Sequence, residues 1–109
     1  MPFDELLAKR LRDILAEECP TEEKRMFGGL AFMVNGHMCC GIVGEVLVVR
    51  VGAALYEHAL SQPHARPMDF TGRSMKGLVY VDPPGYRTTK SLRKWVSNGL
   101  RFVLSLPTK

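Results

Sequence analysis

The stretch from Lys24 to Val51 shows the clearest pattern in the chain, with three apolar runs separated by two tight-turn signals. Asn35-Gly36 is the stronger signal, because a type I′ turn needs positive φ at both central positions and these residues tolerate it. Gly44-Glu45 suits a second tight turn. We therefore predict an antiparallel meander with strands over 25–34, 37–43 and 46–51.

Two other segments repeat apolar residues at spacings of three and four, which indicates amphipathic helices. The first spans 4–18 and ends at Cys19-Pro20, since the residue before a proline is pushed out of the helical region. The last spans about 88–105, where Thr88 or Thr89 can cap it. Its predicted buried stripe is Leu92, Trp95, Val96, Gly99, Phe102, Val103 and Leu106.

The middle of the chain predicts smaller elements. These are a short helix over 52–61, a strand near 68–70, a polar turn region over 71–77, a strand over 78–81 and a turn over 82–85. The resulting order is α-β(3)-α-β(2)-α. We predict one domain over 1–109 of the α+β class, with a five-stranded, mainly antiparallel sheet and its helices on one face.

The meander strands are apolar on both faces, whereas a sheet with one solvated face alternates apolar and polar residues. In the third strand, Leu47, Val49 and Val51 oppose Val46 and Val48. One face is predicted to pack against the chain's own helices. A long loop or a second subunit covers the other, and we hypothesise a homodimer.

Two features of the strands allow either a structural or a functional interpretation. Gly28-Gly29 indicates a bulge, or else room for a ligand or another backbone. Arg50 is a charge within an apolar strand, so it needs exposure or an anionic partner, such as a salt bridge to Asp69. A pocket formed by Gly28, Gly29, Arg50 and Arg73 is the functional alternative.

The motif Met26-Phe27-Gly28-Gly29, at the head of this meander, resembles the N-terminal domain of the TfoX/Sxy family. The resemblance covers essentially the whole chain. Its other residues are Asn35-Gly36, Val48-Val49-Arg50-Val51, Arg66-Pro67-Met68-Asp69-Phe70-Thr71-Gly72-Arg73, Met75-Lys76-Gly77, Val79-Tyr80-Val81-Asp82 and Trp95.

The resemblance implies a fold like that of small secretion-chaperone domains, which are commonly dimeric. It also implies a role near that of bacterial regulators of natural competence, which act with a cyclic-AMP-responsive activator at promoters. Those regulators carry a second, helical C-terminal domain, and this sequence reaches Lys109 without a counterpart. We therefore expect a stand-alone copy of the N-terminal domain. The family implies no catalytic residues.

Composition narrows the class further. The three cysteines are an odd number, and Cys39 and Cys40 are adjacent, so a disulfide framework is not expected. Reduced thiols indicate a cytoplasmic protein. The sequence shows neither a secretory signal at Met1 nor an apolar run long enough to span a bilayer.

The formal net charge of +4 is unevenly distributed. Residues 1–24 hold seven acids and four bases, whereas residues 83–109 hold six bases and no acid. This asymmetry indicates either a solvated helix face or an anionic partner such as nucleic acid. The candidate anion-binding residues are Arg73, Lys76, Arg87, Lys90, Arg93, Lys94 and Arg101.

Other chemistry has little support in the sequence. His37, Cys39 and Cys40 lack the further ligands of a zinc site, and Cys40 is predicted to point away from the other two. No spacing places a histidine against a thiol or pairs two carboxylates for acid–base work. We therefore predict no metal, no cofactor and no catalytic residue.

Two functions remain open. The favoured one is a small non-enzymatic regulatory domain that contacts a protein of transcription regulation or, weakly, nucleic acid. The alternative is a ligand-binding or enzymatic domain that binds a small molecule or anion near Gly28-Gly29, Arg50 and Arg73.

Overall fold

The computed structural model of the chain describes residues 3–26, 28–69 and 74–107. Within these residues the strands form one antiparallel sheet in the order β1-β2-β3-β4-β6-β5. The elements are α1 (Glu5–Ala16), β1 (Glu22–Met26), β2 (Gly29–Val34), β3 (His37–Val43), β4 (Val46–Arg50), α2 (Tyr56–Leu60), β5 (Ala65–Asp69), β6 (Ser74–Val81), the 3₁₀-helix η1 (Pro83–Tyr86) and α3 (Thr89–Leu104).

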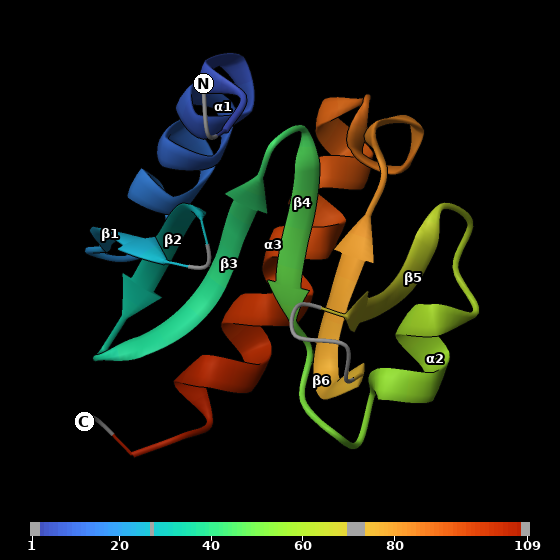
Figure 1. Cartoon of the computed structure of the whole chain (residues 1–109). Coiled ribbons are helices and arrows are strands. Elements are labelled where there is room, and N and C mark those ends of the chain that lie inside the picture. Colours follow the sequence, from blue (N-terminus) through green and yellow to red (C-terminus); the bar gives the residue numbers. More distant parts are fainter. Residues whose placement is uncertain (1–2, 27, 70–73, 108–109) are drawn as a thin grey trace.

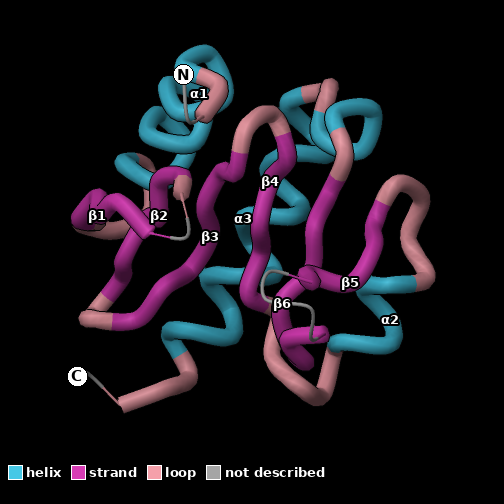
Figure 2. Tube along the Cα trace, viewed as in Figure 1, coloured by secondary structure: helices cyan, strands magenta, loops and turns pink. Residues whose placement is uncertain are grey.

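The α-helices lie on one face of the sheet, as the view in Figure 1 shows. Helix α3 crosses behind β3 and β4 and contacts both, α1 packs beside α3, and α2 lies against β5 and β6. The same two layers are visible in the tube of Figure 2. The predicted α+β class and antiparallel sheet are confirmed. No helix in the described ranges is long and apolar enough to cross a membrane.

The sheet has six strands rather than the predicted five, because the segment predicted as one strand over 25–34 contains a hairpin. Met26 of β1 pairs with Gly29 of β2, so the chain reverses between them. Gly28 has a φ of +75°, which glycine adopts without steric cost. All five residues of β1 are exposed, so the strand lacks the apolar alternation by which sequence reasoning finds strands.

Gly29 is required by the close approach of β3. A Cβ at this position would lie 1.9 Å from the backbone carbonyl oxygen of Ile42. The bulge favoured at Gly28-Gly29 is therefore wrong, since the chain turns at Gly28 and the space at Gly29 holds the neighbouring backbone. The bulge in β2 lies further along, between Phe32 and Met33.

That bulge changes where the adjacent cysteines lie. Met33 pairs with Met38 and Phe32 pairs with Cys40, which leaves Cys39 as the extra residue in β3. Both cysteines are fully buried in the core between the sheet and the helices. The prediction that they point to opposite faces is wrong, because it assumed an unbroken strand.

The main core lies between the helices and the sheet. Helix α1, which contributes to this core, is capped at its N-terminus. The Asp4 carboxylate accepts a hydrogen bond from the Leu7 backbone N–H at 3.0 Å, which satisfies one donor at the helix N-terminus. At the same end of the sheet, the Asp4 backbone N–H donates to the Gly44 carbonyl at 2.7 Å, and Tyr86 Oη donates to the Glu45 carbonyl at 2.5 Å. Leu47, Val49 and Val51 belong to this core while Val48 lies on the opposite face, as the predicted alternation of this strand requires.

The opposite face of the sheet, here called the second face, carries a smaller apolar cluster. Its buried members are Ala31, Met38, Val48 and Met68, all at most 9% exposed in the single chain. Half-buried apolar residues surround them, namely Met33, Val43, Leu78 and Tyr80. Both sheet faces are thus apolar, as predicted, while the homodimer through the second face stays a prediction.

Several boundaries differ from those predicted. Helix α2 begins only at Tyr56, since Gly52 has a φ of +85°, outside the helical region, and residues 53–55 form a turn. Strand β5 begins at Ala65, and Phe70, the predicted end of this strand, lies outside the described residues. The predicted turn over 71–77 is wrong from Ser74 onward, where β6 begins. Residues predicted as a turn over 82–85 lie mainly in η1.

We expect Gly29→Ala to lower the free energy of unfolding by about 3 kcal/mol or more, because an added methyl group in a tight backbone contact forces β2 and β3 apart. Gly28→Ala is the matched control. A Cβ there meets nothing within 4 Å, so only backbone strain of about 1 kcal/mol remains. Urea denaturation measures both losses. Equal losses in the two variants would contradict this explanation.

Candidate functional site

Helix α3 carries most of the predicted site residues. Its N-terminus is capped by Thr88, whose hydroxyl accepts a hydrogen bond from the Ser91 backbone N–H at 3.0 Å. One face is anchored closely to the sheet, since a Cβ at Gly99 would lie 2.9 Å from the Cys39 carbonyl oxygen. The residues of this buried face are Leu92, Trp95, Val96, Gly99, Leu100 and Val103.

Three of the predicted anion-binding residues occupy the exposed side of α3. Lys90, Lys94 and Arg101 are exposed, and Lys94 and Arg101 line one hollow. Lys90 precedes Lys94 by four residues, which places the two lysines on neighbouring turns of one helix face. Arg87 precedes the N-cap Thr88, so helical spacing does not place it on that face.

The other predicted cations lie elsewhere. The Arg93 guanidinium turns toward α1, where its two terminal nitrogens donate to the Glu17 carboxylate at 3.2 and 3.0 Å. This hydrogen-bonded pair raises the pKa of Arg93 and lowers the pKa of Glu17. Lys76 belongs to β6, and Arg73 lies outside the described residues.

Lys90, Lys94 and Arg101 have no carboxylate partner among the described residues. The ion pairs there join Lys9 to Asp13, Arg12 to Glu23, Arg66 to Asp82 and Arg93 to Glu17. The three cations on α3 therefore keep their charge available for an external anion.

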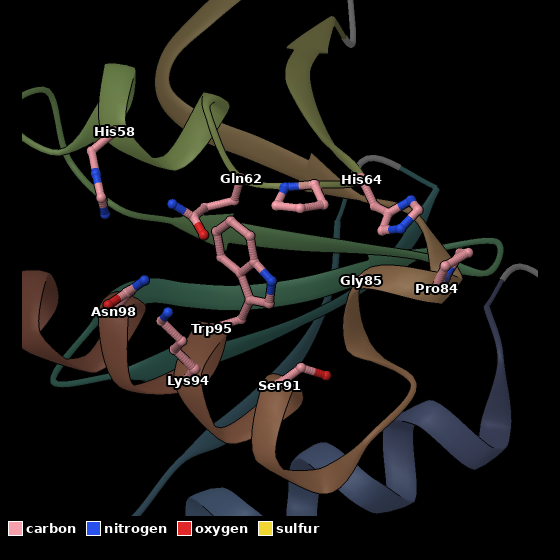
Figure 3. Close-up of a pocket in the computed structure, with 10 residues that line it drawn as sticks. His58, Gln62, His64, Pro84, Gly85, Ser91, Lys94, Trp95 and Asn98 are labelled. Atoms are coloured by element: carbon pink, nitrogen blue, oxygen red, sulfur yellow. The ribbon is translucent and has the colours of Figure 1, made fainter.

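A groove runs between α2 and α3. It consists of two adjoining hollows of about 260 and 450 Å³, both lined by His58, Lys94 and Asn98. Figure 3 shows the first hollow. Its further residues are Gln62, Pro63, His64, Pro84, Gly85, Ser91 and Trp95. The second hollow adds Val51, Leu55, Ala59, Ser97 and Arg101.

The lining of this α2–α3 groove contains cations and neutral polar groups but no carboxylate. Lys94 and Arg101 supply charge, and the Gln62 and Asn98 amides add hydrogen-bond donors. Such a concave surface attracts anions. Sequence reasoning found the two cations but missed His58, His64 and Trp95 as site residues, since no local spacing shows that α2 lies beside α3.

The alternative pocket is not assembled as predicted. Arg50 pairs with Leu78 at one end of β4, whereas Gly29 lies beside Ile42 near the β3–β4 turn at the other end of the sheet. Arg50 and Lys76 instead line a hollow of about 260 Å³. The predicted Arg50–Asp69 salt bridge does not occur within the described ranges.

The interaction that holds Arg50 is with an aromatic ring. Its guanidinium carbon lies 5.2 Å from the centroid of Phe102, within the range of a cation–π contact. Phe102 in turn packs against Gly52, where a Cβ would lie 2.4 Å from the ring. Arg50 therefore helps to hold the end of β4 against α3.

The side chains of His37, Cys39 and Cys40 in β3 make contacts within the fold. His37 Nε2 lies 2.7 Å from the Pro107 carbonyl oxygen. A hydrogen bond with Cys39, together with burial, raises the pKa of the Cys40 thiol well above its usual range, which disfavours the reactive thiolate. In the described part of the chain no three His, Cys, Asp or Glu residues are placed to hold a metal ion.

Comparison with protein families finds a match that covers most of this chain. The family model of the TfoX N-terminal domain matches residues 13–103, from within α1 to near the end of α3. Neither a curated protein nor a solved structure matches. The matched range includes the whole sheet and the α2–α3 groove.

We expect Arg50→Ala to lower the free energy of unfolding by about 0.5–1 kcal/mol, because it removes the cation–π contact with Phe102. Arg50→Lys keeps the charge and is expected to lose less. Thermal unfolding followed by circular dichroism compares the two variants. Unchanged stability in Arg50→Ala would show that the contact contributes nothing.

Proposed function

Because the chain belongs to the TfoX N-terminal domain family, we propose that it is a non-enzymatic regulatory domain that works by contacting another macromolecule. The family relationship supports a regulatory role in general. The contact surface in this proposal is the exposed side of α3.

The proposal rests on which cationic side chains form ion pairs within the fold and which do not. Arg12, Arg66 and Arg93 each bind a carboxylate within the fold, whereas Lys90 and Lys94 bind none among the described residues. Exposed, unneutralised cations on one helix face suit a partner with repeated negative charges. Nucleic acid is the first partner to test, and an acidic protein surface is the second.

The process that we propose is transcription regulation in a bacterial cytoplasm. The resemblance to competence regulators supports the process. The three thiols support the compartment, because Cys19, Cys39 and Cys40 are free and two of them are buried. Unpaired cysteines persist most readily where the surroundings are reducing.

We expect the protein to bind labelled duplex and single-stranded DNA in fluorescence anisotropy, with an affinity that falls linearly on a log–log salt plot. In the triple variant Lys90→Ala/Lys94→Ala/Arg101→Ala the salt slope should decrease by about one for each side chain that contacts a phosphate. Affinity should weaken alike for unrelated sequences, since phosphate contacts carry no sequence information.

The matched control is Lys9→Ala/Arg66→Ala/Arg93→Ala, which removes three cations that already have carboxylate partners. Removing three charges from +4 leaves +1 in both variants, so net charge alone predicts equal weakening. Selective loss in the α3 variant supports the proposal. Equal loss, or no binding at low salt, rules out nucleic acid at this face and directs the search to protein partners.

We also propose that the domain forms a homodimer through the second face. The half-buried Met33, Val43, Leu78 and Tyr80 surround the buried cluster there and would be covered by a second copy. Removing an apolar face of this kind from water lowers the free energy of the system, which favours association.

Light scattering at tens of micromolar is expected to give twice the mass of one chain. Met33→Glu should convert the dimer to a monomer, because it places a charge on the second face. Met26→Glu is the control, since Met26 lies on the exposed edge strand β1 and outside the cluster. A monomeric wild-type protein at this concentration would refute the dimer.

A further inference from the structure

We propose that the α2–α3 groove is a binding site for a small aromatic anion, meaning a flat ring that carries a carboxylate or a phosphate. The ring would lie against Trp95 in the first hollow, and the anionic group would bind the Trp95 indole N–H and Lys94. This site does not depend on whether the exposed face of α3 binds nucleic acid.

Trp95 is the central observation. Its side chain is only 6% exposed, yet it lines the first hollow. No buried side-chain nitrogen or oxygen among the described residues lacks a hydrogen-bond partner, and Trp95 Nε1 makes no hydrogen bond within those residues. Its N–H is therefore accessible to solvent, and Figure 3 shows the indole nitrogen on the side of Gly85, which lines the same hollow. An accessible indole N–H is a hydrogen-bond donor that a ligand acceptor can use.

The surroundings of the indole suit a flat, partly apolar ligand. Figure 3 shows the Trp95 ring standing among Gln62, Lys94 and Asn98, with its nitrogen on the side of Gly85. Pro63 and Pro84 add apolar surface to the same hollow. An aromatic ligand ring stacks favourably on such a surface in an offset or edge-on arrangement.

The charges around the hollow select an anion. Lys94 lines both hollows, Arg101 lines the second, and no carboxylate lines either of them. An oxyanion held by a lysine and an indole N–H makes charge-assisted hydrogen bonds, which are stronger than neutral ones. A cationic or neutral ligand would leave the Lys94 charge uncompensated.

The wall opposite α3 is held in an uncommon conformation. His64 has a φ of +68°, which is uncommon for a residue other than glycine. Its backbone carbonyl accepts a hydrogen bond from the Asp82 backbone N–H at 2.9 Å. At Gly85 a Cβ would lie 3.0 Å from the His64 Cβ, so the two segments pack closely. Strained backbone that the fold maintains beside a hollow is typical of ligand sites.

The chain contains one tryptophan, so its indole N–H gives a single cross-peak in a proton–nitrogen correlation spectrum. We expect this peak to shift saturably when phenyl phosphate or benzoate is added to the full chain. Inorganic phosphate alone and phenol alone should bind at least about tenfold more weakly, since each makes only half of the contacts. The two aromatic anions together show whether the site prefers phosphate or carboxylate.

The matched variants are Lys94→Gln and Lys90→Gln. Both remove one lysine charge from the same face of α3, but only Lys94 lines the groove. We expect Lys94→Gln to weaken phenyl phosphate about tenfold, as a lost charge-assisted hydrogen bond predicts. Lys90→Gln should change the affinity less than twofold. Asn98→Asp, which adds a carboxylate of nearly the same shape, should weaken binding further.

Three results would overturn the proposal. They are no saturable shift with either aromatic anion, equal weakening in Lys94→Gln and Lys90→Gln, and inorganic phosphate binding as tightly as phenyl phosphate. The DNA measurement answers a separate question, because nucleic-acid binding by the exposed face of α3 predicts that the two lysine variants weaken DNA binding to a similar extent.

Discussion

The close contact of α3 with the middle of the sheet is the constraint on which the rest of the structure depends. Gly99 permits it, because any larger residue would place a Cβ 2.9 Å from the Cys39 carbonyl oxygen. The contact buries one face of α3 over β3 and β4. It thereby turns the face that carries Lys90, Lys94 and Arg101 outward, and it sets the distance at which α2 and α3 enclose a groove.

The bulge in the pairing of β2 and β3 lies at the same contact, because Cys39 packs against Gly99 of α3. The bulge opposite Phe32 makes Cys39 the extra residue and lets both Cys39 and Cys40 join the core under α3. Thiols in that position behave as small apolar groups, and the hydrogen bond with Cys39, together with burial, raises the pKa of Cys40.

The fold pairs some of the cationic side chains with carboxylates and leaves others without such a partner among the described residues. Arg12 and Arg93 tie α1 to β1 and to α3 through Glu23 and Glu17. Exposed pairs of this kind contribute only about 0–1 kcal/mol each, so their main consequence is that these cations are already neutralised. Three of the cations without a carboxylate partner among the described residues, Lys90, Lys94 and Arg101, lie on α3 beside the α2–α3 groove.

The sequence by itself determined the α+β class, the family resemblance, the two amphipathic helices and the turns at Asn35-Gly36 and Gly44-Glu45. Each depends on local periodicity or on backbone preferences, which a few consecutive residues carry. The same reasoning missed β1, because an exposed edge strand has no apolar alternation. In the stripe of α3 it chose Phe102 and Leu106, which are half-buried, and omitted the buried Leu100.

Only the tertiary structure decided which charges are paired and where a site can lie. Arg93 and Lys94 are neighbours in the chain, yet one binds Glu17 of α1's C-terminal cap while the other lines a groove with His58 of α2. Arg50 and Gly29 belong to the third and first strands of the predicted meander and lie at opposite ends of the sheet. Contacts between distant segments depend on how the layers pack, and local spacing carries no information about that packing.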